Sequence, residues 1–181
     1  MENLKNLPSQ EGRTIIVTGA NTGLGYETAL FLAEKGAKVV MACRNLKKAT
    51  AAKQKIEQEI STADLEVMEI DLSSLDSVRN FAKNFLSQYD RLDVLINNAG
   101  VMMPPFTKTD DGFELQFAAN YLGHFLLTGL LLDTMLKTPD SRIVSLSSIA
   151  HKNGKINFDD LQSEQKYSAS DAYGQSKLAC L

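Results

Sequence analysis

The sequence is poor in the residues that build disulfide frameworks and metal sites. Its 181 residues include two cysteines, Cys43 and Cys180, and two histidines, His124 and His151. Two distant cysteines form no disulfide framework and indicate a reducing compartment. Because neither histidine has an acidic or cysteine cluster at ligand spacing, the sequence predicts no metal site.

Long apolar segments and excess positive charge are also missing. The first eight residues contain no apolar region of a signal peptide, and no run approaches the roughly 18 apolar residues of a membrane span. The richest run, Phe125–Leu132, is short and is expected to be the buried part of a helix. A net charge of -3 argues against a nucleic-acid partner. We therefore expect a cytoplasmic protein with no membrane or nucleic-acid partner.

Short apolar runs alternate with helical patterns along the chain. The expected strands are 13–18, 38–42, 65–70, 92–96 and 143–146, and the expected helices are 24–35, 46–60, 74–89, 112–137 and 173–181. Strands joined by helices imply right-handed crossovers, so the sequence predicts an α/β fold with a parallel sheet and helices on both faces. We expect one domain, 13–181, preceded by a polar tail, 1–12.

Three glycines separate the first strand from the first helix. Gly19, Gly23 and Gly25 lie in the sequence TGANTGLG. Glycines there allow a tight turn and let backbone N–H groups reach a pyrophosphate at the positive end of a helix. The segment has neither the G-x-G-x-x-G spacing nor the G-K-[ST] of a nucleotide-hydrolysing loop. The sequence therefore favours a dinucleotide site here, with a purely structural turn as the alternative.

Basic residues follow the second strand, where a dinucleotide fold meets the adenosine ribose. An acidic residue at that place would bind a 2′-hydroxyl, whereas an arginine suits a 2′-phosphate. The chain has Arg44 there, with Lys47 and Lys48 close behind. This favours NADP(H) over NAD(H), although all three could be solvated surface charges.

Polar residues also end the later strands, where ligands of such sheets bind. Asp71 could accept a hydrogen bond from an adenine amino group, or could cap a turn or helix. Asn97–Gly100 (NNAG) follows the fourth strand, which an asparagine pair can simply terminate. Ser147 and Ser148 end the fifth strand, where a hydroxyl could bind a substrate carbonyl.

Asn120 is unusual because it lies inside a long apolar helical pattern. Asparagine is a mediocre helix former that competes for backbone hydrogen bonds. It is either a satisfied core amide or a place where the helix opens to hold a water.

Tyr173 and Lys177 are one helical turn apart and share a helix face. Near neutral pH a tyrosine is a poor proton donor or acceptor, since a free phenol has a pKa of about 10. A catalytic tyrosine therefore needs a neighbouring cation, which Lys177 would supply. Taken alone the pair is a weak signal, and an exposed tyrosine beside a solvated lysine is the alternative.

The motifs together resemble those of the short-chain dehydrogenase/reductase family, in its retinol-dehydrogenase-like branch. They occur in family order and are TGxxxGxG at 18–25, DL at 71–72, NNAG at 97–100, Asn120, SS at 147–148 and YxxxK at 173–177. The phrases ACRN at 42–45 and LSSIAH at 146–151 narrow the resemblance to this branch.

The resemblance implies a Rossmann-like, doubly wound sheet of strand order 3-2-1-4-5 and a role for each motif residue. Tyr173 would be the general acid/base, Lys177 would favour its phenolate and hold the nicotinamide ribose, and Ser148 would orient the substrate. Asn120 would anchor a water in a proton relay. The residues expected to contact NADP are Gly19, Asn21, Thr22, Gly23, Leu24, Gly25, Arg44, Asp71, Leu72, Asn97, Ala99, Gly100, Tyr173 and Lys177.

The implied function is interconversion of a small-molecule alcohol with an aldehyde or ketone. Family members continue past the YxxxK helix, so the domain is expected to be C-terminally incomplete, and family helices often build homo-oligomers. Membrane-bound relatives carry an N-terminal anchor that this sequence lacks, so lipid substrates are not implied. Two alternatives remain: a truncated fragment that binds a nucleotide or a partner without turnover, and a nucleotide-binding protein with no redox role.

Overall fold

The structure is a computed structural model that describes residues 8–181, so most of the predicted polar tail lies outside the described residues. The chain forms two compact units. Unit 1 comprises the described part of Met1–Glu69 with Tyr89–Asn98 and Asp133–Val144. Unit 2 comprises Ile70–Gln88, Ala99–Leu132 and Ser145–Leu181. The predicted division into tail and single domain stays a prediction.

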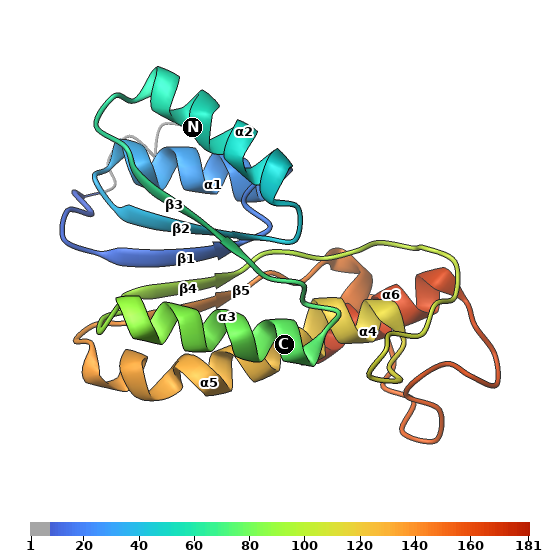
Figure 1. The fold of residues 1–181 in the computed structure, drawn as a ribbon. Helices are drawn as coiled ribbons and strands as arrows, with labels where there is room; N and C mark the ends of the chain where they lie inside the picture. Colours follow the sequence, from blue (N-terminus) through green and yellow to red (C-terminus); the bar gives the residue numbers. More distant parts are fainter. Residues whose placement is uncertain (1–7) are drawn as a thin grey trace. The chain divides into compact units, whose positions relative to one another are not determined.

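A five-stranded sheet is the centre of unit 1 (Figure 1). Its strands are β1 (Thr14–Thr18), β2 (Lys38–Cys43), β3 (Asp64–Glu69), β4 (Val94–Asn97) and β5 (Arg142–Ser145). The order β3-β2-β1-β4-β5 confirms the predicted arrangement. The pairings of β1 with β2 and β4, and of β2 with β3, are parallel, so these four strands end at the same edge of the sheet.

The middle strands lie at the centre of the sheet because they are apolar on both faces. All five residues of β1 are buried, and β2 is buried from Val39 onward. The helices α1 (Gly23–Glu34) and α2 (Leu46–Glu59) lie over these strands in Figure 1. Their buried residues are small or aliphatic and belong to the same core cluster as the strand residues. Gly36, with φ of 84°, follows α1 in the left-handed conformation that glycine adopts readily at a helix end.

Unit 2 is mainly helical. Its elements are α3 (Leu75–Gln88), α4 (Leu115–Phe117), the π-helical turn η1 (Ala118–Leu122), the first part of α5 (Gly123–Lys137), the 3₁₀ turn η2 (Ile149–Asn153) and α6 (Ala169–Ala179). The expected helix 112–137 is therefore three consecutive elements. The last helix begins four residues before Tyr173, where the side chain of Ser168 caps it.

The expectation that Phe125–Leu132 is buried is only partly right. Leu127 and Leu131 are fully buried, but Phe125 is 67% exposed, because only one face of α5 packs inward. Among the described residues, the helical stretch Leu115–Lys137 is the one long and apolar enough to cross a membrane, by length and composition alone. Half of its most apolar window is buried, as in a core helix. The cytoplasmic location and the lack of a membrane partner stay predictions.

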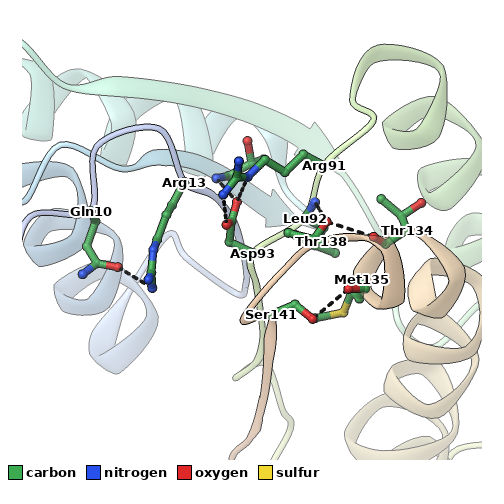
Figure 2. Close-up of polar contacts among 10 residues, drawn as sticks. Gln10, Arg13, Arg91, Leu92, Asp93, Thr134, Met135, Thr138 and Ser141 are labelled. Atoms are coloured by element: carbon green, nitrogen blue, oxygen red, sulfur yellow. Dashed lines mark hydrogen bonds and ion pairs between the residues drawn. The ribbon is translucent and has the colours of Figure 1, made fainter.

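An ion pair between Arg91 and Asp93 lies just before β4, at the edge of the sheet where the strands start (Figure 2). Arg91 donates two hydrogen bonds of 2.7 Å to the buried Asp93 carboxylate, which also accepts from the Thr14 N–H at 2.9 Å. Burial alone would raise the pKa of the Asp93 carboxyl, but the hydrogen bonds from Arg91 and Thr14 hold it below its usual value. The carboxylate thus ties β1 to β4 in its charged form.

Replacing Asp93 by alanine should destabilise unit 1 at neutral pH. Loss of the acceptor leaves the buried Thr14 N–H without this partner, which costs about 1–3 kcal/mol. Because the folded pKa is lowered, the contribution is present above the unfolded value of about 3.9 and is lost as the pH falls below it. Urea denaturation at neutral pH and near pH 3 would measure both effects. An equal loss in the exposed control Asp90→Ala would contradict this account.

Candidate active site

The glycine segment of unit 1 forms a tight turn between β1 and α1. Gly19 and Gly23 have φ values of 68° and 55°, a conformation that side chains disfavour. The Gly19 N–H continues the ladder by bonding the Ala42 carbonyl at 2.8 Å. Thr22 is the N-cap of α1 but makes no side-chain capping hydrogen bond. α1 therefore begins directly at this turn, and the Thr22 side chain does not occupy its first backbone N–H groups, as an anion site requires.

Gly25 lets α1 approach the turn more closely than any other residue could. A Cβ at Gly25 would lie 2.3 Å from the Gly19 carbonyl oxygen and 2.5 Å from Asn98 Nδ2. Asn98 in turn donates from Nδ2 to the Thr18 carbonyl at 2.7 Å and from its backbone N–H to Thr18 Oγ1 at 2.9 Å. The end of β4 thus braces the end of β1. Asn97, beside it, is buried.

The Cys43 side chain contacts the backbone of the same turn. Its sulfur accepts hydrogen bonds from the backbone N–H groups of Ala20 and Asn21, and burial raises the pKa of the thiol to about 11. The thiol is therefore neutral at physiological pH and acts as part of the core. The sequence offered no signal for this role, since it depends on the register of β1 and β2.

A cavity of about 510 Å³ opens beside the glycine turn. It is lined by Asn21, Thr22, Gly23, Tyr26, Lys48, Ala51, Ala52 and Lys55. Two of these side chains, Lys48 and Lys55, are cationic and exposed on α2. Arg44 is exposed just after β2 and does not line this cavity. Leu24, also named from the sequence, is 73% exposed.

In unit 2, Asp71 has the turn role that the sequence left open. Its Oδ1 accepts from the Ser73 N–H at 2.9 Å and from Ser73 Oγ at 2.6 Å. Leu72 packs directly beneath α5, because a Cβ at Gly123 would lie 2.3 Å from the Leu72 carbonyl oxygen. The contact of Asp71 with adenine and the contact of Leu72 with NADP stay predictions.

The Asn120 side chain is a satisfied buried amide, and it lies in a turn that opens the helix. Its Oδ1 accepts from the Val101 N–H at 2.7 Å. Its Nδ2 donates to the Val101 carbonyl at 3.0 Å and to Ser176 Oγ at 2.9 Å. Both alternatives raised by the sequence are thus partly right. Since both amide protons are used, a water anchored on Asn120 would have to donate to one of its oxygens.

Lys177 and Tyr173 lie together on α6, as their spacing predicts. The Lys177 ammonium is 6.0 Å from the centroid of the Tyr173 ring and is nearly buried. Its Nζ donates to the Leu146 carbonyl at 3.0 Å, while Ser147 Oγ donates to the Lys177 carbonyl at 2.6 Å. The alternative of a solvated lysine is wrong, because this ammonium is held inside unit 2.

Gly100 leaves room for that ammonium. A Cβ there would lie 3.4 Å from Lys177 Nζ and 3.0 Å from Asn120 Oδ1. Unit 2 therefore brings together four residues named from the sequence, Gly100, Asn120, Tyr173 and Lys177. Ala99 precedes Gly100 in the same segment.

Ser148 is the N-cap of η2, where its Oγ accepts from the Ala150 N–H at 3.3 Å. The turn packs backbone to backbone on α6, since a Cβ at Gly154 would lie 2.4 Å from the Gly174 carbonyl oxygen. This places the Ser148 turn against the helix that carries Tyr173. The glycine pair that permits it was not singled out in the sequence.

A buried polar network that the sequence did not reveal fixes the start of α6. The Gln116 side chain accepts from the Met103 N–H at 2.8 Å and donates to Tyr167 and to the Ala169 carbonyl at 3.1 and 3.0 Å. The Glu114 carboxylate caps α4, and burial raises the pKa of this acid against the hydrogen bonds it accepts. These residues hold the loop after β4 against α6.

His124 is a further titratable group near Asn120 and Lys177. Burial lowers the pKa of the imidazole to about 4, opposed by its hydrogen bond to Asn120 and helped by the charge of Lys177. Among the described residues there is no cluster of three or more metal-ligand side chains.

Comparison with known proteins assigns this fold and these motifs to one family. Residues 13–179 match the family described as short chain dehydrogenase, and the chain belongs to that family. It is 50% identical over 170 residues to retinol dehydrogenase 12 of Mus musculus, covering 94% of this chain and 54% of that protein. The expected retinol-dehydrogenase-like branch is thereby confirmed. The chain spans about half the length of the curated relatives it matches.

Solved structures show the same fold. An uncharacterised protein of Mycobacterium paratuberculosis superposes with a TM-score of 0.85 at 46% identity, covering 98% of this chain and 62% of that one. A metagenomic short-chain oxidoreductase in complex with NADP gives a TM-score of 0.76 at 28% identity, covering 94% and 72% of the two chains.

Gly25→Ala should disrupt the glycine turn, because the new Cβ meets backbone and the side chain that braces it. We expect a loss of at least about 2 kcal/mol in the free energy of unfolding. Gly129→Ala is the matched control, since its Cβ meets nothing within 4 Å. On an exposed face of α5 that change should stabilise by about 0.5–1 kcal/mol. Thermal and urea denaturation would compare them, and equal effects would refute the close approach.

Proposed function

We propose that this chain is an NADP(H)-dependent oxidoreductase that interconverts an alcohol and a carbonyl, with Tyr173 as general acid/base. The observation that carries the proposal is the buried ammonium of Lys177 beside the Tyr173 ring. A cation in this place stabilises a phenolate, which is the form that accepts a proton. The hydrogen bond of this ammonium goes to the Leu146 carbonyl, not to a carboxylate, and a buried charge held in this way is costly unless it serves such a purpose.

The residues around the glycine turn fit a dinucleotide. Gly25 permits the close approach of α1 to the turn between β1 and α1. The N-terminal amides of α1 would present positive charge to a pyrophosphate bound there. A bound nicotinamide would supply or accept the hydride. The protein's part is to bind the cofactor, to orient the substrate and to move one proton.

The proton step is assigned to the phenol of Tyr173. In reduction it would give its proton to the carbonyl oxygen as negative charge develops there, and in oxidation the phenolate would take the alcohol proton. Ser148 would hold the same oxygen through its hydroxyl. General acid–base catalysis of this kind contributes roughly 10²–10⁴-fold, and a second hydrogen-bond donor adds electrostatic stabilisation.

Positive charge supports NADP(H) as the cofactor. Arg44 is exposed after β2, and Lys48 and Lys55 line the cavity that includes Asn21. A related short-chain oxidoreductase binds NADP. Arginine suits a 2′-phosphate because its guanidinium donates two parallel hydrogen bonds.

Arg44→Ala should weaken NADPH binding by about tenfold or more and NADH binding by much less, as expected for a charge-assisted hydrogen bond. Fluorescence titration with both nucleotides would measure this. Arg79→Ala removes an exposed arginine from α3 and serves as the control. Equal losses for the two nucleotides would remove Arg44 from 2′-phosphate recognition.

Tyr173→Phe should abolish turnover and leave the affinity for NADPH nearly unchanged, because it removes only the phenol oxygen. The assay is NADPH oxidation with a panel of small aldehydes and ketones. Retained activity would exclude Tyr173 as the proton donor. If the parent chain binds NADPH without turnover, the alternative of a nucleotide-binding fragment holds instead.

A further inference from the structure

The backbone carbonyl of Asn120 is contacted by two side chains. It lies in the π-helical turn η1, in which the Gly123 N–H bonds the Ala118 carbonyl five residues back. Two side chains from later in the chain donate to the Asn120 carbonyl. They are His124 through Nδ1 at 3.0 Å and Cys180 through Sγ at 3.3 Å, with the thiol proton shared between this carbonyl and that of Ser176 at 3.2 Å. Turns of this kind often mark functional positions in a helix.

The His124 ring has one protonation state that fits. A carbonyl oxygen only accepts, so Nδ1 must carry the proton. The imidazole is 6% exposed, and its lowered pKa, about 4, keeps it neutral at physiological pH. The nearby Lys177 ammonium also disfavours a second positive charge. His124 is therefore a neutral donor with a fixed tautomer.

Asn120, whose carbonyl His124 contacts, is connected to Tyr173, the proposed proton donor. Asn120 donates from Nδ2 to Ser176 Oγ at 2.9 Å, and Ser176 Oγ donates to the Tyr173 carbonyl at 2.8 Å. Asn120 also pairs with both backbone groups of Val101. The imidazole is thus connected to the Tyr173 carbonyl through the backbone and side chain of Asn120 and the hydroxyl of Ser176.

We propose that His124 is a positioning residue: its Nδ1–H fixes the Asn120 carbonyl, and Asn120 then sets the geometry of Val101, Ser176 and Tyr173. The inference rests on the proposed function for its catalytic meaning, but its structural part stands on these contacts alone. A residue that only fills space would have no need of a polar ring here. Leucine, of similar volume, would serve such a packing role better.

Two variants separate positioning from packing. His124→Asn keeps a donor, since the asparagine Nδ2 occupies the place of the imidazole Nδ1. His124→Leu removes the donor and keeps an apolar filler. The direct readout is hydrogen exchange of the Val101 amide, which bonds Asn120 Oδ1, measured relative to the amides of β1.

In His124→Leu we expect the Val101 amide to exchange about tenfold faster or more, as for loss of a buried hydrogen bond, and in His124→Asn to stay within about threefold of the parent. In the proposed NADPH-dependent reduction, kcat should fall about tenfold in the leucine variant with the KM for NADPH nearly unchanged, while the asparagine variant keeps most of its kcat. Protected exchange in the leucine variant with loss in the asparagine variant would establish packing. Equal behaviour of the two variants would also overturn the proposal.

The unmodified protein provides a test that depends neither on variants nor on turnover. A long-range ¹⁵N–¹H spectrum should show the Nδ1–H tautomer of His124 and no titration between about pH 5 and 8. An Nε2–H tautomer, or titration in that range, would refute the inference. If this spectrum and the Val101 exchange behave as expected while no aldehyde or ketone is reduced, the proposed function fails and the positioning of Asn120 stands.

Discussion

The close approach of α1 to the glycine turn is the constraint on which the proposed cofactor site depends. Only at Gly25 can the helix come so near the Gly19 carbonyl, and the same spot is in reach of Asn98 from the end of β4. The turn therefore takes its shape from two strands. Because β1 and β4 are parallel and paired, their ends meet at one edge and Asn98 can bond Thr18. The proposed anion site would thus be built mainly from backbone groups, with the Asn98 side chain holding the end of β1 in place.

Unit 2 solves a different problem, that of holding an ammonium in a nearly dry place. Lys177 has a carbonyl acceptor in Leu146 and an aromatic face in Tyr173, and the missing side chain of Gly100 makes room for it. Burial of a charge is costly unless it is compensated by such contacts. The hydrogen bond of this ammonium goes to a backbone carbonyl and not to a carboxylate. This arrangement is the one that the proposed role of Lys177 beside Tyr173 requires.

The sequence predicted the strands because they follow from local pattern, but it placed the start of the last helix four residues too late. Short apolar runs carry their own signal along the chain, whereas the order of the strands followed from the family resemblance. The π-helical turn was not predicted as such, although Asn120 stood out as a poor helix former. The hydrogen-bond partners of Asn120 are Val101, Ser176 and Cys180. They come from distant segments, so no local pattern in the sequence predicts them. The roles of Gln116 and His124 were missed for the same reason: a buried polar residue is recognised only once its partner is known. The exposure of Phe125 shows the converse, since a run of apolar residues does not say how many of them face the core.

The central claim is that the glycine turn of unit 1 binds the nucleotide, and the most direct measurement is a ¹⁵N–¹H spectrum of the chain titrated with NADPH. We expect the largest shifts at the backbone amides of residues 19–25, followed by the side-chain amide of Asn98. Saturable binding that left those amides unmoved and shifted others instead, or no binding at all, would contradict the account.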